Sequence, residues 1–269
     1  MRLIVTRPER DALRWVRDLQ TAGYNAVALP LITIGPVADT THLQQAWLAL
    51  PSYAGVMFVS GNAVDYFFKS KPALAPVSIA LVAPELRAWA PGPGTANALL
   101  RAGVAPARID APALEAGQFD SETLWSVVAP QVKPGDRVLI VRGGAGGAVN
   151  GSDAPDGPGL GRDWFAAQVA QAGGVVDFVV AYQRTGPDFK AAEQALAREA
   201  SVDGSFWLLS SSEAVVNLCQ AMPGQSWQKA GALATHPRIA QAARAAGFGV
   251  VLESRPLLSD VLASIESVA

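Results

Sequence analysis

The sequence contains a single cysteine, Cys219, and two histidines, His42 and His236, in 269 residues. One cysteine excludes an internal disulfide and any metal site built from several cysteines. Two histidines argue against a histidine-based metal centre, so we expect no bound metal. Cys219 falls within an expected helix at 213–220. We expect its side chain to be buried as a small apolar group rather than to act as a nucleophile.

Charged residues are also scarce, at 16% of the chain against about 25% in typical soluble domains. The net charge of −2 argues against a nucleic-acid surface, which needs a concentrated basic patch. No apolar run approaches the roughly 20 residues that cross a bilayer, and Arg2, Arg7 and Glu9 leave no apolar core of a signal peptide. We expect a monomeric cytoplasmic protein without nucleic-acid or membrane partners.

What the chain does contain is one pattern written twice. Apolar runs rich in β-branched residues open the two copies, at 3–8 and 138–143, and each run leads to an arginine. The helical stretch that follows stops at a glycine, Gly23 or Gly173. Later segments are echoed in the same way: 58–64 by 208–215, and 94–103 by 238–247. With 50% hydrophobic residues the chain can fill two α/β cores, and two such units make a cleft between them.

Short apolar runs alternate with helical patterns along almost the whole chain. Expected strands are 3–5, 26–34, 55–59, 78–82, 108–111, 137–141, 175–182, 205–209, 230–234 and 250–253. Expected helices are 11–22, 43–50, 63–68, 95–102, 121–128, 164–172, 191–200, 213–220, 238–246 and 258–267. This alternation predicts two doubly wound α/β domains with parallel sheets, which bind ligands at the carboxyl ends of their strands.

Two stretches, 26–37 and 175–187, are long for buried strands and pass from apolar to polar or proline-rich sequence. We interpret 30–37 and 180–187 as paired linkers that cross between the domains. One domain is then discontinuous, with residues 1–34 and 184–269, and the other comprises 38–179. The alternative is two contiguous halves, one for each copy of the pattern.

The glycine-rich segment 143–161 follows an expected strand, which suggests a nucleotide-binding loop. Its spacing is not that of a phosphate-binding loop, and no Gly-Lys-Ser/Thr sequence is present in it. We expect a flexible surface insertion instead, because this composition cannot bury a core.

Polar residues follow the expected strands, where the free N–H groups of helix starts favour anions. Arg7 follows the first strand, and Arg142 holds the corresponding place in the second copy. Each arginine can bind an anionic ligand or pair with a carboxylate of its own domain, such as Glu9 for Arg7. Both interpretations stay open.

Small hydroxyl and amide residues follow two further strands. Ser60 and Asn62 lie in one copy, and Ser210 and Ser211 lie in the other. Serine and asparagine cap helices well, and their small size also lets a carboxylate approach the helix start. The two roles can coexist because they use different N–H groups.

Two more junctions between strand and helix lie at 91–96, which contains Thr95, and at 235–238, which contains His236 and Arg238. We favour a structural role for His236, and we expect Asp120 to mark a helix start. Tyr182 lies on an expected linker, where its phenol can donate a proton or simply pack with its hydroxyl group in water.

At these residues the chain resembles the uroporphyrinogen-III synthase family. Matching motifs extend over nearly the whole chain, at 5–8, 29–32, 58–64, 94–96, 120–124, 138–143, 180–184 and 234–240. Each motif is weak alone, but their order and spacing together are specific.

The resemblance implies two α/β domains joined by a two-stranded linker, with the active site in the cleft. It also implies a cyclising hydro-lyase of tetrapyrrole (heme or siroheme) biosynthesis, which needs no cofactor or metal. The reaction closes hydroxymethylbilane into uroporphyrinogen III with loss of water and inversion of the terminal pyrrole ring. By the motif match, Tyr182 takes the place of the proton donor, and ligand contacts fall on Ser60, Thr95, Ser210 and Ser211.

Arg238 stands where family members often carry a hydroxyl residue. With Arg7, Asn62 and Arg142 it completes the expected substrate-binding set.

Two other classes fit part of the pattern. A non-enzymatic two-lobed binding or regulatory protein for an anionic small molecule shares the expected cleft and lacks obvious catalytic groups. A secretion signal or a DNA-binding segment would favour it, and the sequence shows neither. A nucleotide-sugar transferase with twin α/β domains needs a nucleotide site that we do not find in the sequence.

Overall fold

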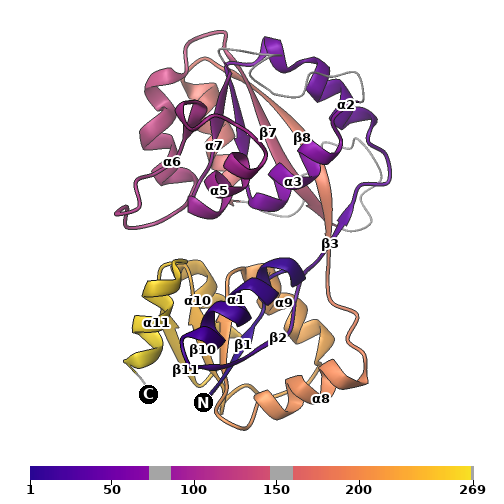
Figure 1. Cartoon of the computed structure of the whole chain (residues 1–269), viewed down its shortest axis with the longest axis vertical. Coiled ribbons are helices and arrows are strands. Elements are labelled where there is room, and N and C mark those ends of the chain that lie inside the picture. The colour runs from indigo at the N-terminus through magenta and orange to yellow at the C-terminus, as the bar shows by residue number, and fades with distance from the viewer. Residues whose placement is uncertain (73–85, 146–159, 268–269) are drawn as a thin grey trace. The chain divides into compact units, whose positions relative to one another are not determined.

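The computed structural model describes residues 1–72, 86–145 and 160–267 of the chain. These residues fall into two compact units (Figure 1). Unit 1 comprises Met1–Ile34 and Thr185–Ala269, and unit 2 comprises Gly35–Arg184. Unit 1 is therefore discontinuous in sequence, whereas unit 2 is a single stretch.

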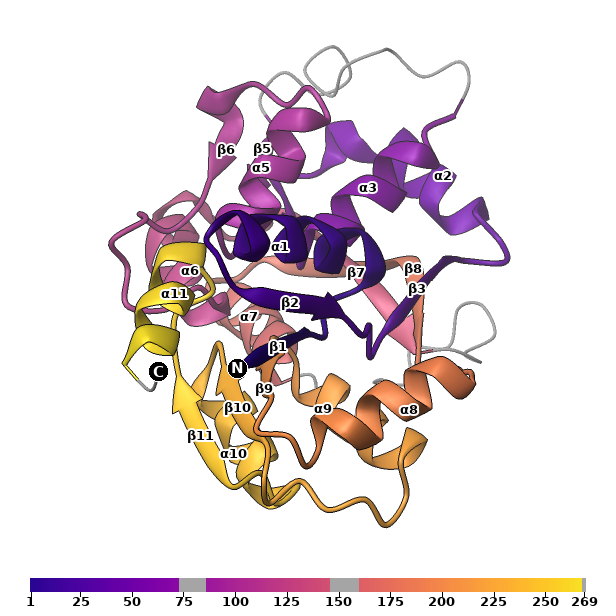
Figure 2. The ribbon, with the colours of Figure 1, turned by 60° about the horizontal axis from the view of Figure 1, so that its bottom comes forward.

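Unit 1 is built on a five-stranded sheet in the order β11-β10-β9-β1-β2, with every neighbouring pair parallel. The strands are β1 (Arg2–Val5), β2 (Asn25–Ala28), β9 (Phe206–Leu209), β10 (Gly231–Ala234) and β11 (Val250–Glu253). The helices are α1 (Glu9–Thr21), α8 (Ala191–Ala200), α9 (Ser212–Ala221), α10 (Pro237–Ala245) and α11 (Leu258–Glu266). Figure 2 shows α1 lying along the β1–β2 side of this sheet.

The alternation of side chains along β1 explains why both faces of this sheet are covered. Leu3 and Val5 point to one face, where they pack with residues of α1 and α11. Ile4 points to the other face, where it packs with residues of α8, α9 and α10. All three side chains are fully buried. A continuous apolar run is what a strand buried on both faces of a parallel sheet requires.

Unit 2 contains a six-stranded sheet in the order β3-β8-β7-β4-β5-β6. The strands are β3 (Thr33–Pro36), β4 (Gly55–Phe58), β5 (Arg87–Trp89), β6 (Ile109–Asp110), β7 (Arg137–Ala145) and β8 (Val175–Thr185). Its described helices are α2 (Thr41–Leu48), α3 (Gly61–Lys69), α5 (Pro93–Arg101), α6 (Ser121–Val128) and α7 (Leu160–Gln171). Its described residues also form the short 3-10 turns η1 (Leu50–Ser52), η2 (Pro106–Arg108) and η3 (Ala129–Gln131).

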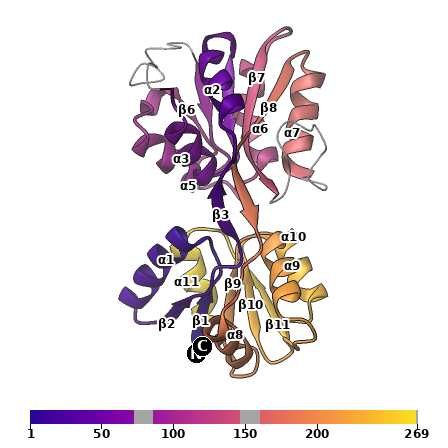
Figure 3. The same ribbon diagram turned by 90° about the vertical axis from the view of Figure 1, so that its right-hand side faces the viewer.

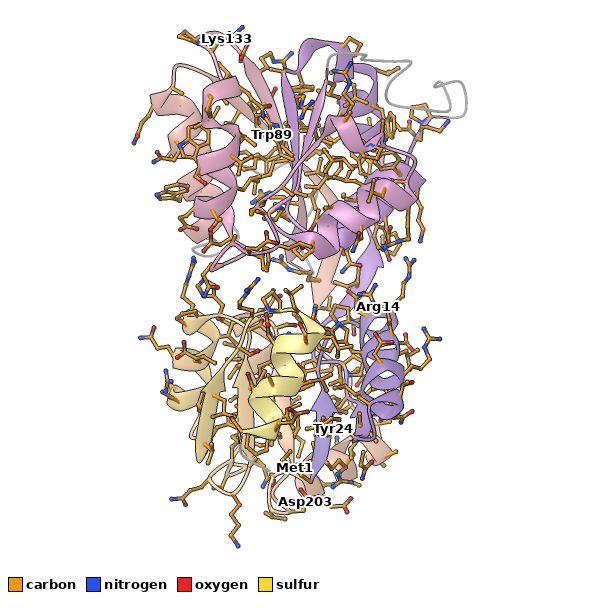
Figure 4. The ribbon with its side chains drawn as sticks, turned by 60° about the vertical axis from the view of Figure 1, so that its left-hand side comes forward. Met1, Arg14, Tyr24, Trp89, Lys133 and Asp203 are labelled. Atoms are coloured by element: carbon orange, nitrogen blue, oxygen red, sulfur yellow. The ribbon has the colours of Figure 1, made fainter. Side chains whose placement is uncertain are left out.

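The core of unit 2 follows the same alternation. Met57 on β4 packs with Trp89 and with residues of α6 and α7 on one face, and Trp89 lies inside the unit (Figure 4). The next residue, Phe58, faces the opposite side and meets the ring of Phe67 on α3 at 5.5 Å between centroids. Trp47 stacks on Phe67 from α2 at 4.9 Å. The sheet is thus covered by aromatic and aliphatic side chains on both faces.

The two sheets share one topology, which confirms the prediction of two similar doubly wound parallel sheets. In unit 1 the order from one edge is β2-β1-β9-β10-β11, and in unit 2 the corresponding order is β8-β7-β4-β5-β6. β1 therefore corresponds to β7, and β9 corresponds to β4. The repeats noticed in the sequence, 3–8 with 138–143 and 58–64 with 208–215, fall on these equivalent strands.

Several expected boundaries were wrong. The stretch 26–34 is not one strand: β2 belongs to the sheet of unit 1, and β3 belongs to that of unit 2. Pro30, which lacks an N–H group, lies between them. β5 was not predicted, because its three residues, which include Arg87, make too short an apolar run. The strand expected at 175–182 and the linker expected at 180–187 overlap in one strand, β8, which lies beside β3 (Figure 3).

Other expectations differ from the structure or fall outside the described residues. Within the insertion expected at 143–161, residues 143–145 belong to β7 and residues 160–161 to α7, and 146–159 lie outside the described residues. The strand expected at 78–82 also lies outside them. Cys219 is exposed on α9, which contradicts the expected burial. Its neighbours Leu218 and Val215 occupy the apolar face of that helix instead.

Candidate active site

In each sheet the strand order reverses at one point, between β1 and β9 in unit 1 and between β7 and β4 in unit 2. Ligands of open α/β sheets bind outside the carboxyl ends of the strands at such a point. Arg7 and Ser210 follow the two strands at this point in unit 1, and Arg142 and Ser60 take the same places in unit 2. The sequence-predicted residues thus gather at equivalent edges of the two sheets.

Tyr182 lies on β8 and is almost fully buried, with 3% of its surface exposed. Its register partner on β7 is Gly143, next to an irregularity in the pairing of the two strands. A Cβ atom on Gly143 would lie 2.5 Å from two carbons of the Tyr182 ring. The ring of Tyr66 lies on α3 at 5.9 Å from that of Tyr182. The phenol is therefore held in one place by its packing.

The Tyr182 hydroxyl group lies 3.0 Å from the hydroxyl oxygen of Ser60, and either atom can be the donor. Ser60 ends the loop after β4 and caps α3, because its Oγ accepts the N–H of Ala63 at 3.2 Å. The capping role expected for this serine is confirmed. Two hydroxyl groups share a single bond here, so in either direction one hydroxyl hydrogen is left over for a ligand.

Asn62 and Thr95 lie at the starts of two neighbouring helices of unit 2. Asn62 is the second residue of α3, and Thr95 is the third residue of α5. A Cβ atom on Gly61 would lie 3.7 Å from the carbonyl oxygen of Gly94, so these two helix starts are adjacent. Within the described residues, neither side chain makes a hydrogen bond. The amide and the hydroxyl group therefore keep their hydrogen-bonding capacity, although Thr95 is buried, with 6% of its surface exposed.

Arg142 lies one residue beyond the last residue of β7 that pairs with β4. It is not at the end of its strand as expected, because β7 continues beside β8 as far as Ala145. Its guanidinium carbon lies 5.2 Å from the ring centroid of Phe178. Its Nε is buried, and no hydrogen-bond acceptor among the described residues reaches it. The cation rests on an aromatic ring rather than on a carboxylate.

Arg7 shows the same arrangement in unit 1. Its guanidinium carbon lies 4.4 Å from the ring centroid of Trp15 on α1. No described carboxylate, Glu9 included, forms an ion pair with it, so the structural interpretation by pairing with Glu9 is not supported. Burial lowers the pKa of Arg7 to about 10, partly offset by the charge of Asp11. The side chain is still a cation at neutral pH, and it is a poorly solvated one.

Ser210 and Ser211 follow β9 at the same edge of unit 1. Ser211 occupies the N-cap position of α9, but its side chain accepts no N–H group there. Among the residues that the structure describes, neither hydroxyl group has a hydrogen-bond partner. The first N–H groups of α9 also lack a capping side chain, and such a helix start attracts anions. Thr6, buried beside them, donates its hydroxyl to the carbonyl of Leu208 at 2.7 Å and ties β1 to β9.

His236 and Asp120 act structurally, as the sequence interpretation favoured. The Nδ1 of His236 accepts the N–H of Arg238 at 3.1 Å and caps α10. Asp120 caps α6 by accepting the N–H of Thr123 at 2.8 Å. Arg238 is the second residue of α10, and its side chain is exposed.

At the opposite edges of the two sheets, where the strands begin, the arginines form ion pairs. Arg2 at the start of β1 forms ion pairs with Asp203 and Glu199, and Figure 4 places Asp203 beside Met1 at that edge. Arg137 at the start of β7 forms an ion pair with Asp177 at 2.6 Å. Each sheet thus has a paired arginine at its amino edge and, within the described residues, an arginine without an ion pair at its carboxyl edge. Cations without a described ion pair at the carboxyl edges of both sheets fit an anionic ligand.

Sequence reasoning missed the partners of these residues. The guanidinium groups of Arg7 and Arg142 lie over the rings of Trp15 and Phe178. Gly143, which has no side chain, leaves space for the ring of Tyr182. Trp15 lies eight residues after Arg7, on the helix expected at 11–22, so this contact could have been considered from the sequence. Nothing in the sequence connects Phe178 with Arg142 or Gly143 with Tyr182, because those contacts arise from strand register.

Within residues 1–72, 86–145 and 160–267, no three His, Cys, Asp or Glu side chains are grouped so that they could hold a metal ion. No helix in those ranges has the length and apolar character of a membrane span.

Comparison with known proteins gives the family. The model of the family described as uroporphyrinogen-III synthase HemD matches residues 14–262. The chain belongs to this family. The uroporphyrinogen-III synthase of Chlorobaculum parvum is 32% identical over 143 residues, which are 52% of this chain and 52% of that protein. The match thus spans about half the length of this curated relative.

Solved structures of uroporphyrinogen-III synthases share the fold. A mutant enzyme from Thermus thermophilus has a TM-score of 0.57 and 16% identity, covering 99% of this chain and 98% of its own. The enzyme from Helicobacter pylori has a TM-score of 0.57 and 15% identity, covering all of both chains. At such identities the likeness supports the fold alone, which agrees with the expected α/β class.

Proposed function

We propose that this chain is a uroporphyrinogen-III synthase, a cyclising hydro-lyase of tetrapyrrole biosynthesis. It closes hydroxymethylbilane into uroporphyrinogen III with loss of water and inversion of the terminal pyrrole ring. Family membership supports the reaction, as does the name of the half-matched relative. The rest of the support comes from the two sheet edges.

The observation that carries the proposal is the placement of Arg7 and Arg142 on aromatic rings without ion pairs within the described residues. Each pyrrole of the substrate bears an acetate and a propionate, so the molecule is a flexible polyanion. Arginine binds carboxylates through paired N–H groups, and the starts of α3, α5 and α9 supply further N–H donors. A few such donors hold a polyanion without making the whole protein basic, which fits the net charge of −2.

In this proposal, side chains of both units bind the carboxylates of the substrate. Arg7, Ser210, Ser211 and Arg238 serve substrate carboxylates from unit 1. Asn62, Thr95 and Arg142 serve them from unit 2. Inversion of the terminal ring depends on which pyrrole carbon reaches the reactive centre first, so we assign most of the catalysis to positioning. Closure in free solution gives the isomer without inversion.

Tyr182 supplies the proton. The phenol protonates the hydroxyl group of the substrate, the carbon–oxygen bond breaks, and water leaves. The electron-deficient carbon is then attacked by the substituted α carbon of the terminal pyrrole, which forms a spiro intermediate. After rearrangement, a ring carbon loses a proton when the last pyrrole regains aromaticity. That proton returns to the phenolate, so the enzyme ends as it began.

The decisive test uses freshly made hydroxymethylbilane, with the products oxidised to porphyrins and the isomers separated by chromatography. We expect the type III isomer to predominate in the presence of the protein. A protein-free sample run in parallel gives the type I isomer as the reference. If the protein left the type I isomer predominant to the same degree as that reference, the proposal would be wrong, and a non-enzymatic carboxylate-binding protein would replace it.

We also propose that the enzyme works as a cytoplasmic monomer, with no nucleic-acid or membrane partner. The low charge and the small substrate support this part. Sedimentation equilibrium with and without substrate, and fractionation of cells that produce the full chain, test it. A dimer at micromolar concentration, or recovery with the membranes, would contradict it.

A further inference from the structure

The hydroxyl groups of Tyr182 and Ser60 are joined by a hydrogen bond in unit 2. Tyr182 is buried, and within the described residues its hydroxyl group has one hydrogen-bond partner, the Oγ of Ser60 at 3.0 Å. The ring cannot swing toward β7, because it already fills the space beside Gly143. Ser60 can therefore affect the position and the charge of the Tyr182 phenol oxygen.

Ser60 is itself held in place by its helix. Its Oγ accepts the N–H of Ala63 at 3.2 Å, which occupies one of its two lone pairs. What remains is one O–H donor and one further lone pair. With respect to Tyr182, Ser60 can therefore accept from the neutral phenol or donate to a phenolate by rotating a single hydrogen.

We propose that Ser60 acts on the reaction through Tyr182, as a positioning residue that donates a hydrogen bond to the phenolate formed when Tyr182 gives up its proton. The inference rests on the proposed function. When the phenolic proton moves to the leaving hydroxyl group, negative charge develops on the Tyr182 oxygen. The Ser60 hydroxyl turns toward it, and the bond becomes a charge-assisted one, which is stronger than the neutral bond it replaces. When the proton returns, the bond returns to its neutral form.

This assignment differs from the role that family resemblance implied for Ser60, which is direct contact with substrate. A residue that contacts substrate and a residue that acts through Tyr182 respond differently to the loss of Tyr182. In the first case the effects of the two substitutions multiply. In the second case the Ser60 substitution loses its effect once the phenol is gone.

The experiment is a double-mutant cycle of Ser60→Ala and Tyr182→Phe, with kcat and KM measured for hydroxymethylbilane. We expect Ser60→Ala alone to lower kcat by about tenfold with little change in KM, as for the loss of a charge-assisted hydrogen bond. In the Tyr182→Phe background the same substitution should change kcat by less than about twofold. Effects on kcat that multiply in the double variant would overturn the inference, as would a change confined to KM.

Controls separate the hydrogen bond from the helix cap. Ser60→Thr keeps both the hydroxyl group and the cap and should restore most of kcat. Ser70→Ala removes the bond from Ser70 to the carbonyl of Tyr66 at the other end of α3, and should leave kcat unchanged. Loss of kcat in Ser70→Ala equal to that in Ser60→Ala would mean that damage to α3 explains both, which overturns the inference.

A second readout does not depend on turnover. The Cζ carbon of Tyr182, labelled with ¹³C and assigned by its absence in Tyr182→Phe, reports on bonding to the phenol oxygen. Its resonance should move in Ser60→Ala and stay in place in Ser70→Ala. An unmoved resonance in Ser60→Ala overturns the inference whether or not the protein is active. A moved resonance in a protein that makes only the type I isomer would reject the proposed function and, with it, a role for the pair in catalysis.

Discussion

Gly143 and Tyr182 are register partners on β7 and β8, and the tyrosine ring occupies the space where any other residue at 143 would place its Cβ atom. The distance from that Cβ position to the ring carbons would be 2.5 Å, well inside van der Waals contact. The ring is buried on its other sides, so it has nowhere close to move. The position of the phenol thus depends on a missing side chain on the neighbouring strand.

The first prediction concerns this contact. Gly143→Ala should displace the Tyr182 ring and lower kcat to about the level of Tyr182→Phe, because the phenol no longer reaches the leaving group. Gly117→Ala is the matched control, since nothing lies within 4 Å of its added Cβ atom. Steady-state kinetics of both variants make the comparison. Full activity in Gly143→Ala would show that the chemistry does not need the phenol where it lies.

The Tyr182→Phe variant should have a lower kcat but should keep measurable activity. In the proposed mechanism general acid catalysis contributes less than positioning, and the variant keeps the hydroxyl group of Ser60. We expect about a tenfold loss of kcat, with the ratio of type III to type I isomer maintained. The isomer ratio and the rate are read from the same chromatogram. Full turnover in Tyr182→Phe, together with failure of variants at ligand contacts, would reject the acid role of Tyr182.

The second pair of variants contrasts the two ends of β1. Burial lowers the pKa of Arg7 to about 10, so the folded chain gives up this proton more readily than the unfolded chain. The charge therefore opposes folding at neutral pH, and this opposition fades as the pH rises above about 10. Arg7→Met should raise the thermal midpoint while raising KM about tenfold or more, because an anion-binding cation is lost.

Arg2→Met is the control for Arg7→Met. It removes ion pairs to Asp203 and Glu199, so it should lower stability by about 1 kcal/mol and leave KM unchanged. Calorimetry gives the thermal midpoint of each variant, and steady-state kinetics gives its KM. If Arg7→Met were the less stable of the two and bound substrate normally, Arg7 would be a structural residue.

The same contrast exists along β7. Arg142→Met should raise KM about tenfold, since the guanidinium that rests on Phe178 has a buried Nε without a described acceptor. Arg137→Met breaks the ion pair with Asp177 at the opposite end of the strand and should lower the thermal midpoint with no effect on KM. Isothermal titration with a stable polycarboxylate porphyrinogen analogue checks the affinities directly. Equal affinities for the two variants would remove Arg142 from the binding set.

Alkaline stability provides a prediction that is independent of catalysis. Burial, reinforced by the hydrogen bond and charge of Asp177, raises the pKa of Tyr53 to about 12. The unfolded chain ionises this phenol near pH 10, so its contribution to stability is complete below that pH and is lost as the pH rises through about 12. The free energy of unfolding of Tyr53→Phe, measured with urea, should fall less steeply over this window. Parallel curves for the two proteins would contradict the assignment.

Many helices and strands could be predicted from the sequence, but most tertiary contacts between them could not. The strand at 3–5 and the helix at 191–200 could be predicted, because a β-branched apolar run and an alanine-rich amphipathic stretch each have one plausible structure. The split of 26–34 into β2 and β3 could not be predicted, because one apolar stretch supplies strands to two sheets and only tertiary pairing decides where it divides.

The candidate site shows the same limit. Arg7 and Arg142 could be singled out by their place after repeated strands, but whether a carboxylate reaches either of them depends on packing. The bond between Ser60 and Tyr182 joins residues 122 positions apart, and it follows from a strand order that no local pattern encodes. Cys219 illustrates the reverse error, since its helix was predicted correctly but the phase of its exposed face was not.

The shared topology has a consequence for synthesis on the ribosome. Apart from its added edge strand β3, unit 2 uses the strand order of unit 1 but begins at β4, the equivalent of β9, so its sheet lies within one uninterrupted stretch, 33–185. The stretch Gly35–Arg184 is therefore complete before α8 to α11 have been made. Domains generally fold as units while the chain emerges. β1 therefore cannot pair with its neighbour β9 until the whole of unit 2 has been made.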